Sequence, residues 1–292
     1  MSDFLLALLT QFGLYGLIAL SLALVFGTSR FMNLAVGDFV VLGAYAAVAL
    51  SALPFWLGLP LAMIILAPLF YVLDRGLLSR ISDPMAGMLV TWGIGIVIRQ
   101  VLEVVFTSTG RSVDAPLGGS VNLLGVEYPV YRIVIALIAI VLVGAVIAYV
   151  YGSRAGLRLR AVAENPSMAA FFGARPGRTR ALAFTAGGVL VVAAGYLYSP
   201  VLGVSPAMGF SLLVPGFVAV LMTRAGSFIA PVIAVVFVVA AQVLLRQIVT
   251  DAVAETLFYV VVLTAVVIRA NPHIRRFITW IATRPRSFAP RA

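Results

Sequence analysis

The amino-acid sequence predicts an all-α polytopic membrane protein with about seven to nine transmembrane helices, some of them broken or re-entrant. Hydrophobic residues fill 63% of the 292 positions and charged residues only 10%, whereas a soluble globular chain carries about 25% charged residues. The mean hydropathy is +1.13. Apolar runs of about 20 residues, the length that crosses a bilayer as a helix, recur along the chain.

These runs give the predicted helices in chain order. They cover residues 4–26, 54–73, 85–105, 129–151, 181–200, 228–245 and 255–268. A shorter run over 33–50 carries Asp38. A carboxylate in lipid is costly, so this segment is either a full crossing with a polar face or a re-entrant segment.

The region between residues 203 and 222 predicts a broken pattern. Four turn-forming residues lie there: Gly203, Pro206, Gly209 and Pro215. The remaining apolar run, 214–222, is too short to cross a bilayer as a helix. We therefore expect one broken or re-entrant segment here.

Arginine distribution predicts the side of the membrane on which each loop lies. The arginine-rich segments are 74–84, a loop over 152–180 and a basic tail over 269–292, all predicted to be cytoplasmic. Residues 107–129, rich in Gly, Ser and Thr, are predicted to lie outside. The number of membrane crossings then determines the side of the N-terminus. The N-terminus lies outside if 33–50 crosses fully, and inside if that segment is re-entrant. The net charge of +10 follows this loop pattern, which argues against binding to nucleic acid.

A short helix is predicted inside the arginine-rich loop, over residues 166–172. Asn165 is a good N-cap, Pro166 fits the first helical position, and Gly173 fits the C-terminal stop. Glu164 lies beside the positive end of this helix dipole. The signals at both ends agree, so the helix is well delimited.

The predicted short helix has one apolar face, because Met168, Phe171 and Phe172 follow the i, i+3, i+4 spacing. Such a face either packs on lipid or on the protein core, or it docks into a partner. Isolated helices this short are unstable without docking, which favours the partner.

The richest polar segment within the apolar mass surrounds Asn33, Gly37 and Asp38. One interpretation is a polar break that lines a substrate path, with Met208 and Phe210 as later apolar wall residues. The other is structural: Asp38 caps a helix or pairs with Arg30, and Asn33 caps the second helix. The residues leave both interpretations open.

The sequence predicts no catalytic residue and no metal site in this chain. Its one histidine, His273, follows the last apolar run, and cysteine is absent. The chain also has no lysine, so the phosphate-binding loop that ends in Gly-Lys-Ser/Thr cannot occur. If transport is driven by ATP, another chain must bind it.

Three segments carry a resemblance to a known family. They are the Gly27-Thr28 to Gly43-Ala44-Tyr45 region, the Arg160-Ala161-Val162-Ala163-Glu164-Asn165-Pro166 to Gly173 region, and Gly203-Val204-Ser205-Pro206-Ala207-Met208-Gly209-Phe210. In spacing and order these segments closely resemble ABC-importer permeases of the branched-chain amino acid type. The second segment resembles the cytoplasmic coupling loop of that family, and the resemblance runs from residue 10 to about residue 272.

The resemblance implies that residues 1–292 form a single transmembrane permease domain in the bacterial inner membrane. It implies two ATPase subunits that bind ATP and Mg, and no cofactor in this chain. It also implies a second permease subunit, or a second copy of this chain, and an extracytoplasmic solute-binding protein. The coupling residues would be Glu164, Asn165, Met168, Phe171 and Phe172.

Two departures from the family pattern affect the expected path. Val36 stands where relatives often carry His or Gln, and Arg224 stands in a turn where a small residue is usual. Either could indicate an altered substrate or a homodimeric arrangement. The apolar path residues favour branched-chain or other hydrophobic amino acids. Aromatic or short organic acids come second, and amides or urea third.

Two other classes of protein fit less well. An ion-coupled secondary transporter could use Asp38 as a proton or sodium site, but it would carry more intramembrane carboxylates. A membrane scaffold would bind partners without moving solute, but it needs no unwound backbone in the bilayer.

Overall fold

The computed structural model describes residues 2–107, 109–123, 126–224, 226–250, 253–254, 256–261 and 264. The chain divides into two compact units, residues 1–240 and 241–292. The second unit holds the end of α10 and further helical residues at 253–254, 256–261 and 264. The predicted basic tail and half of the predicted last span, 255–268, lie outside the described residues.

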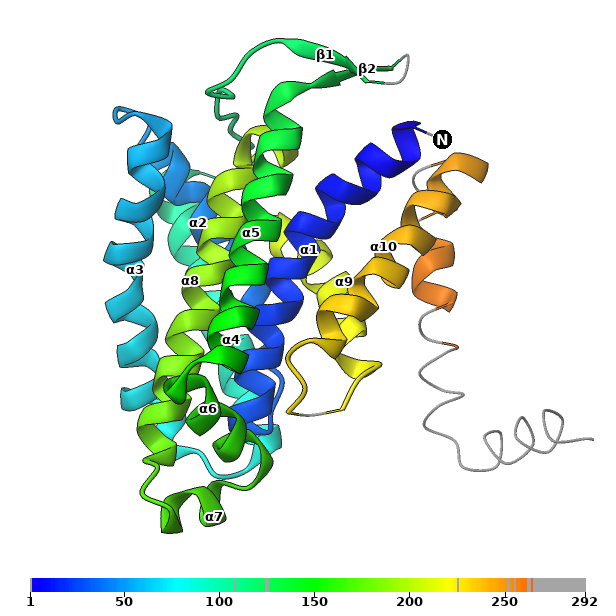
Figure 1. The fold of residues 1–292 in the computed structure, drawn as a ribbon. Coiled ribbons are helices and arrows are strands. Elements are labelled where there is room, and N and C mark those ends of the chain that lie inside the picture. Colours follow the sequence, from blue (N-terminus) through cyan, green and yellow to red (C-terminus); the bar gives the residue numbers. More distant parts are fainter. Residues whose placement is uncertain are drawn as a thin grey trace, which may run out of the picture. The chain divides into compact units, whose positions relative to one another are not determined.

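Helices dominate the described chain (Figure 1). They are α1 (Ser2–Ser29), α2 (Val36–Ala49), α3 (Phe55–Gly76), α4 (Pro84–Phe106), α5 (Val130–Gly152), α6 (Arg154–Glu164), α7 (Pro166–Phe171), α8 (Pro176–Leu202), α9 (Gly209–Leu221) and α10 (Ala230–Ile248). Two 3₁₀ turns, Leu78–Arg80 and Pro206–Met208, and a hairpin of β1 (Ser120–Leu123) with β2 (Val126–Pro129) complete the described elements.

The described residues include six helices long and apolar enough to cross a membrane, and two shorter apolar segments, Val36–Ala49 and Pro206–Leu221. This confirms the predicted fold class, an all-α multi-pass membrane protein with some helices too short to span. The long helices follow the apolar runs closely, as α4 (Pro84–Phe106) does over the predicted 85–105.

The first unit has two ends, and α1 runs between them (Figure 1). Near its start, Thr10 shares a hydrogen bond with Tyr128 of β2, with 2.9 Å between the hydroxyl oxygens. Past its last residue, Arg30 contacts the end of α6. We call these the hairpin end and the coupling end.

Residues 30–49 bring the chain back to the hairpin end. Tyr45, near the end of α2, packs against Phe106, the last residue of α4, with 4.9 Å between ring centroids. The 33–50 segment therefore returns to the end where the chain began. The N-terminus lies at the hairpin end, which the arginine pattern assigns to the outside.

Helices α2 and α8 lie at the centre of the first unit, and both are largely buried. Their backbones approach each other closely. A Cβ on Gly43 would collide with the backbone of Val192, and one on Gly195 with the backbone of Val40. Small residues allow this approach between helices in a membrane. Helix α8 is buried along most of its length from Ala181 to Ser199.

The structure corrects two local predictions. Pro215 lies within the continuous helix α9, and Gly209 is the first residue of that helix, so neither forms a turn. Gly203 does end α8, with a φ of 71°. Within the arginine-rich loop, the helix α6 was not predicted, and α8 begins at Pro176 rather than near residue 181.

Candidate functional site

An ion pair within the apolar helices joins Asp38 of α2 to Arg99 of α4. The Asp38 Oδ1 atom accepts from Arg99 Nη2 at 3.0 Å and from Nε at 3.3 Å. The Asp38 side chain is 6% exposed and that of Arg99 is 33% exposed. Two opposite charges so placed satisfy each other where water is scarce.

The two structural interpretations of Asp38, a pair with Arg30 and a helix cap, are both wrong. Its partner is Arg99 rather than Arg30. Helix α2 begins after Ala35 with no side-chain cap, so Asp38 does not cap it.

Glycines from three helices make room for the carboxylate. A Cβ on Gly95 of α4 would collide with Asp38 Oδ2, and one on Gly37 of α2 would collide with the Gly209 carbonyl of α9. Because α2, α4 and α9 approach this closely, the Asp38 carboxylate fits between them and reaches the Arg99 guanidinium. The close packing fixes the geometry of the pair.

A cavity of about 400 Å³ borders this ion pair. Its lining is Leu34, Gly37, Asp38, Trp92, Arg99, Gly209, Phe210 and Leu213. Three predicted path residues, Gly37, Asp38 and Phe210, lie in this lining, and Phe210 is 69% exposed. The walls are apolar apart from the one ion pair.

Two predicted path residues, Asn33 and Met208, lie outside that lining. Asn33 is buried, and its Oδ1 accepts from the Ala35 backbone N–H at 3.0 Å, which orders the turn before α2. Met208 packs against the core at the start of α9. The neighbouring Leu34 N–H donates to Thr91 Oγ1 of α4 at 3.1 Å.

Sequence reasoning did not identify Arg99 as a site residue. Part of the signal was available, since Asp38 is the one charged residue of the run 33–50 and Arg99 is the one basic residue of the run 85–105, although Glu103 lies four residues after Arg99. Intramembrane charges pair with one another, which is the rule that would have joined them.

The predicted short helix exists as α7, and its ends agree with the prediction. Asn165 Oδ1 accepts from the Met168 backbone N–H at 3.0 Å, as an N-cap does. Pro166 is the first helical residue, and Gly173 has the positive φ of a C-terminal stop, 82°. The helix ends at Phe171, with Phe172 as its C-cap.

The apolar face of α7 points away from the protein. Met168 is 53% exposed, Phe171 is 87% exposed and Phe172 is 86% exposed, whereas Ala169 is buried. Glu164, the last residue of α6, is also exposed. Two almost fully exposed phenylalanines on a capped helix form a surface suited to a protein partner.

Arg30 connects α1 to the junction of α6 and α7. Its Nη2 atom donates to the Ala163 carbonyl at 3.0 Å and to the Glu164 carbonyl at 2.8 Å. These carbonyls lie at the C-terminal end of α6, where the helix dipole favours a cation. Arg30 has a φ of 62°, the left-handed backbone of a helix stop. The sequence did not reveal this contact.

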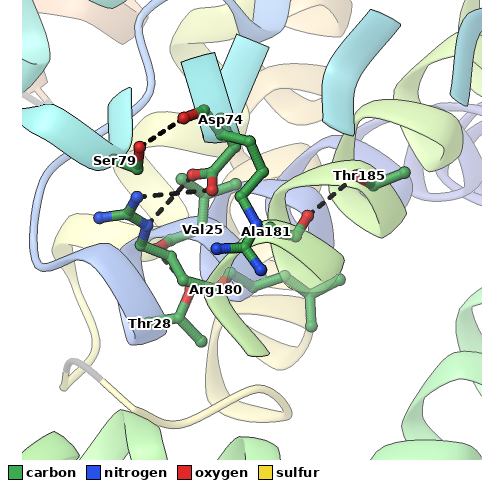
Figure 2. Close-up of polar contacts among 9 residues, drawn as sticks. Val25, Thr28, Asp74, Ser79, Arg180, Ala181 and Thr185 are labelled. Atoms are coloured by element: carbon green, nitrogen blue, oxygen red, sulfur yellow. Dashed lines mark hydrogen bonds and ion pairs between the residues drawn. The ribbon is translucent and has the colours of Figure 1, made fainter. Parts of the chain in front are cut away.

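A second ion pair joins α3 and α8 near the coupling end of the first unit (Figure 2). Arg180 of α8 donates from Nε to Oδ1 of the buried Asp74 of α3 at 3.1 Å. Figure 2 also draws Thr28, near the end of α1, whose hydroxyl donates to the Val25 carbonyl. Both charged residues were predicted to lie in loops, but they belong to helices.

Comparisons with known proteins identify the family of the chain. The family described as branched-chain amino acid transport system, permease component, matches residues 4–268. The chain is 27% identical over 218 residues to a probable branched-chain amino acid transport permease protein LivH of Methanocaldococcus jannaschii, covering 70% of this chain and 68% of the relative. It is 24% identical over 232 residues to the high-affinity branched-chain amino acid transport system permease protein LivH of Salmonella typhimurium, covering 73% and 75%.

No solved structure matches the chain. The family match covers nearly the whole sequence and includes the Asp38–Arg99 pair, Arg30 and helix α7. The chain therefore belongs to the family of permease components of branched-chain amino acid transport systems.

Proposed function

We propose that this chain is the transmembrane permease subunit of an ATP-driven ABC importer in the bacterial inner membrane, and that it carries branched-chain or other hydrophobic amino acids. Two ATPase subunits, which bind ATP and Mg, would supply the energy. The pore would form with a second permease subunit or a second copy of this chain. An extracytoplasmic binding protein would deliver the substrate.

The exposed aromatic face of α7 is the observation that carries the ATPase partnership. Phe171 and Phe172 would leave water on docking, and buried aromatic anchors dominate the free energy of protein interfaces. The N-cap at Asn165 holds the helix ready for a groove on the partner. Arg30 then connects the docked segment to α1 and the turn before α2.

The Asp38–Arg99 cavity supports the substrate class. Leu34, Trp92 and Leu213 offer apolar walls for a hydrophobic side chain. Arg99 can meet a carboxylate and Asp38 can meet an ammonium group, so a zwitterion finds both partners there. A sugar would lose water from each hydroxyl without finding a replacement partner.

Replacing both phenylalanines tests the ATPase partnership. The F171A and F172A double variant should lose copurification with the ATPase subunits, since each anchor contributes about 2 kcal/mol or more to binding. The control is Val104→Ala, which shortens an exposed apolar side chain away from α7, at a residue that is 76% exposed at the hairpin end of α4. If the double variant retains its ATPase and its ATP turnover, α7 is not the docking helix.

Reconstituted uptake tests the substrate. The permease, its ATPases and the binding protein would be placed in vesicles with labelled leucine. Isoleucine and valine should compete with leucine and stimulate ATP hydrolysis. If benzoate or urea competes instead and the three amino acids do not, the amino acid assignment is wrong while the importer assignment stands.

A further inference from the structure

A second, larger cavity lies at the coupling end of the first unit, away from the Asp38–Arg99 pair. Its volume is about 740 Å³, and it is bounded by α1, α5, α6, α8 and the turn after α7. The tight turn between α5 and α6 shapes it. Ser153 Oγ caps α6 by accepting from the Gly156 N–H at 2.9 Å, and Gly156 packs against the Val150 carbonyl where no side chain fits.

The cavity is divided into an apolar part and a basic part. Leu142 and Val146 of α5 and Leu182 of α8 line its apolar part. Arg158 of α6, Arg178 of α8 and Arg175 line the part nearest the coupling end. Apolar walls between long membrane helices, with cations at the helix ends, match the two halves of a membrane lipid.

The three arginines have no anionic partner within the described residues. No Asp or Glu belongs to the lining. The ion pairs found in that part of the chain join Arg99 to Asp38 and Arg180 to Asp74. Clustered guanidinium groups repel one another, and a phosphate oxygen is the acceptor that their planar donors fit best.

We propose that this cavity binds an anionic phospholipid, with an acyl chain against α5 and α8 and the phosphate against Arg158, Arg175 and Arg178. Charge complementarity selects an anionic headgroup over a zwitterionic one. The apolar walls select a lipid over a free phosphate ion. The site is independent of the solute that the permease carries.

The test uses the full chain, purified in detergent and stripped of lipid. Dioleoyl phosphatidylglycerol, dioleoyl phosphatidylcholine and inorganic phosphate are titrated separately, and bound molecules are counted by native mass spectrometry. Phosphatidylglycerol should bind at least tenfold more tightly than phosphatidylcholine. Equal binding of the two lipids, or saturation by inorganic phosphate that blocks phosphatidylglycerol, would overturn the proposal.

Two pairs of variants locate the site. The R158Q and R178Q double variant should bind phosphatidylglycerol about 25-fold more weakly, since each arginine contributes about a fivefold factor. The control is the R80Q and R224Q double variant, which removes the same charge from exposed residues outside the cavity. An equal loss in both double variants would mean that only net charge matters, and the proposal would fail.

The second pair tests the apolar part with all arginines kept. Ala186→Trp fills the lining on α8 and should reduce phosphatidylglycerol binding about tenfold or more. Leu89→Trp places the same side chain at an exposed position of α4. Thermal unfolding of every variant checks that it is folded. A folded Ala186→Trp variant that binds the lipid as the parent does would rule out this cavity.

Discussion

At the residue scale, the Asp38–Arg99 ion pair joins α2 and α4 among apolar helices. Asp38 and Arg99 satisfy each other beside a cavity whose other walls are apolar. Breaking a buried pair costs more than removing both members, because one charge is then left without a partner. This asymmetry separates a structural role from a role in transport.

A double-mutant cycle uses that asymmetry. Asp38→Asn alone should lower the free energy of unfolding by roughly 1–3 kcal/mol. This loss is smaller than the loss expected on breaking a fully buried ion pair, because Arg99 is partly exposed. The D38N and R99Q double variant should recover most of that stability. If the charges meet the substrate, uptake stays low in the double variant. Thermal unfolding and vesicle uptake measure the two effects, and normal uptake by D38N would leave the pair a structural role only.

The glycine beside the carboxylate gives a second prediction. Gly95→Ala places a methyl group against Asp38 Oδ2, so the pair must shift, and the free energy of unfolding should fall by about 1–3 kcal/mol. Gly93→Ala is the matched control on the same helix, since its Cβ would meet no atom within 4 Å. That change should be neutral or stabilising by up to about 1 kcal/mol. Equal unfolding temperatures for the two variants would contradict the predicted contact.

At the element scale, a basic side chain connects α1 with the end of α6, directly before the exposed helix α7. The two hydrogen bonds from Arg30 end on the Ala163 and Glu164 carbonyls, and the chain then continues from Arg30 to α2. Movement of a docked α7 can therefore reach the turn before α2 without passing through the rest of the bundle. Such a connection should matter for coupling more than for folding.

Arg30→Gly tests the connection. Glycine suits the positive φ at this helix stop, so the backbone gain should offset part of the lost hydrogen bonds, and stability should change by no more than about 1 kcal/mol. ATP hydrolysis should continue while uptake per ATP falls. The ratio of uptake to hydrolysis in reconstituted vesicles measures this. An unchanged ratio would show that coupling does not pass through Arg30.

At the scale of the whole molecule, the sequence predicted what depends on local pattern. The long spans follow their apolar runs, and α7 follows from its cap and stop residues. Helix α6 was not predicted, because its arginines made this amphipathic segment resemble a charged loop. Pro215 suggested a break, but the surrounding packing keeps α9 helical across it. The Asp38–Arg99 and Arg30 contacts depend on distant segments meeting, which local pattern does not encode.

The path of residues 30–49 leads to a prediction about topology. Because α2 returns to the hairpin end, the α2–α3 turn and the segment before the hairpin should face the same side of the membrane, opposite α7. The chain has no cysteine, so single cysteines can be introduced at the exposed residues Ser51, Ser112 and Ser167. A membrane-impermeant maleimide then reports which of them faces outward in intact cells.

Ser51→Cys and Ser112→Cys should react in intact cells, and Ser167→Cys only after the membrane is opened. The control is the parent chain, which offers no thiol to the reagent. If Ser51→Cys behaves like Ser167→Cys, residues 30–49 do not cross. If all three residues are reversed together, the fold stands and the orientation drawn from the arginines is wrong. The two outcomes test different properties. The first tests the path of the chain, which contacts such as that of Tyr45 with Phe106 determine. The second tests the orientation of the protein in the membrane, which loop charge determines.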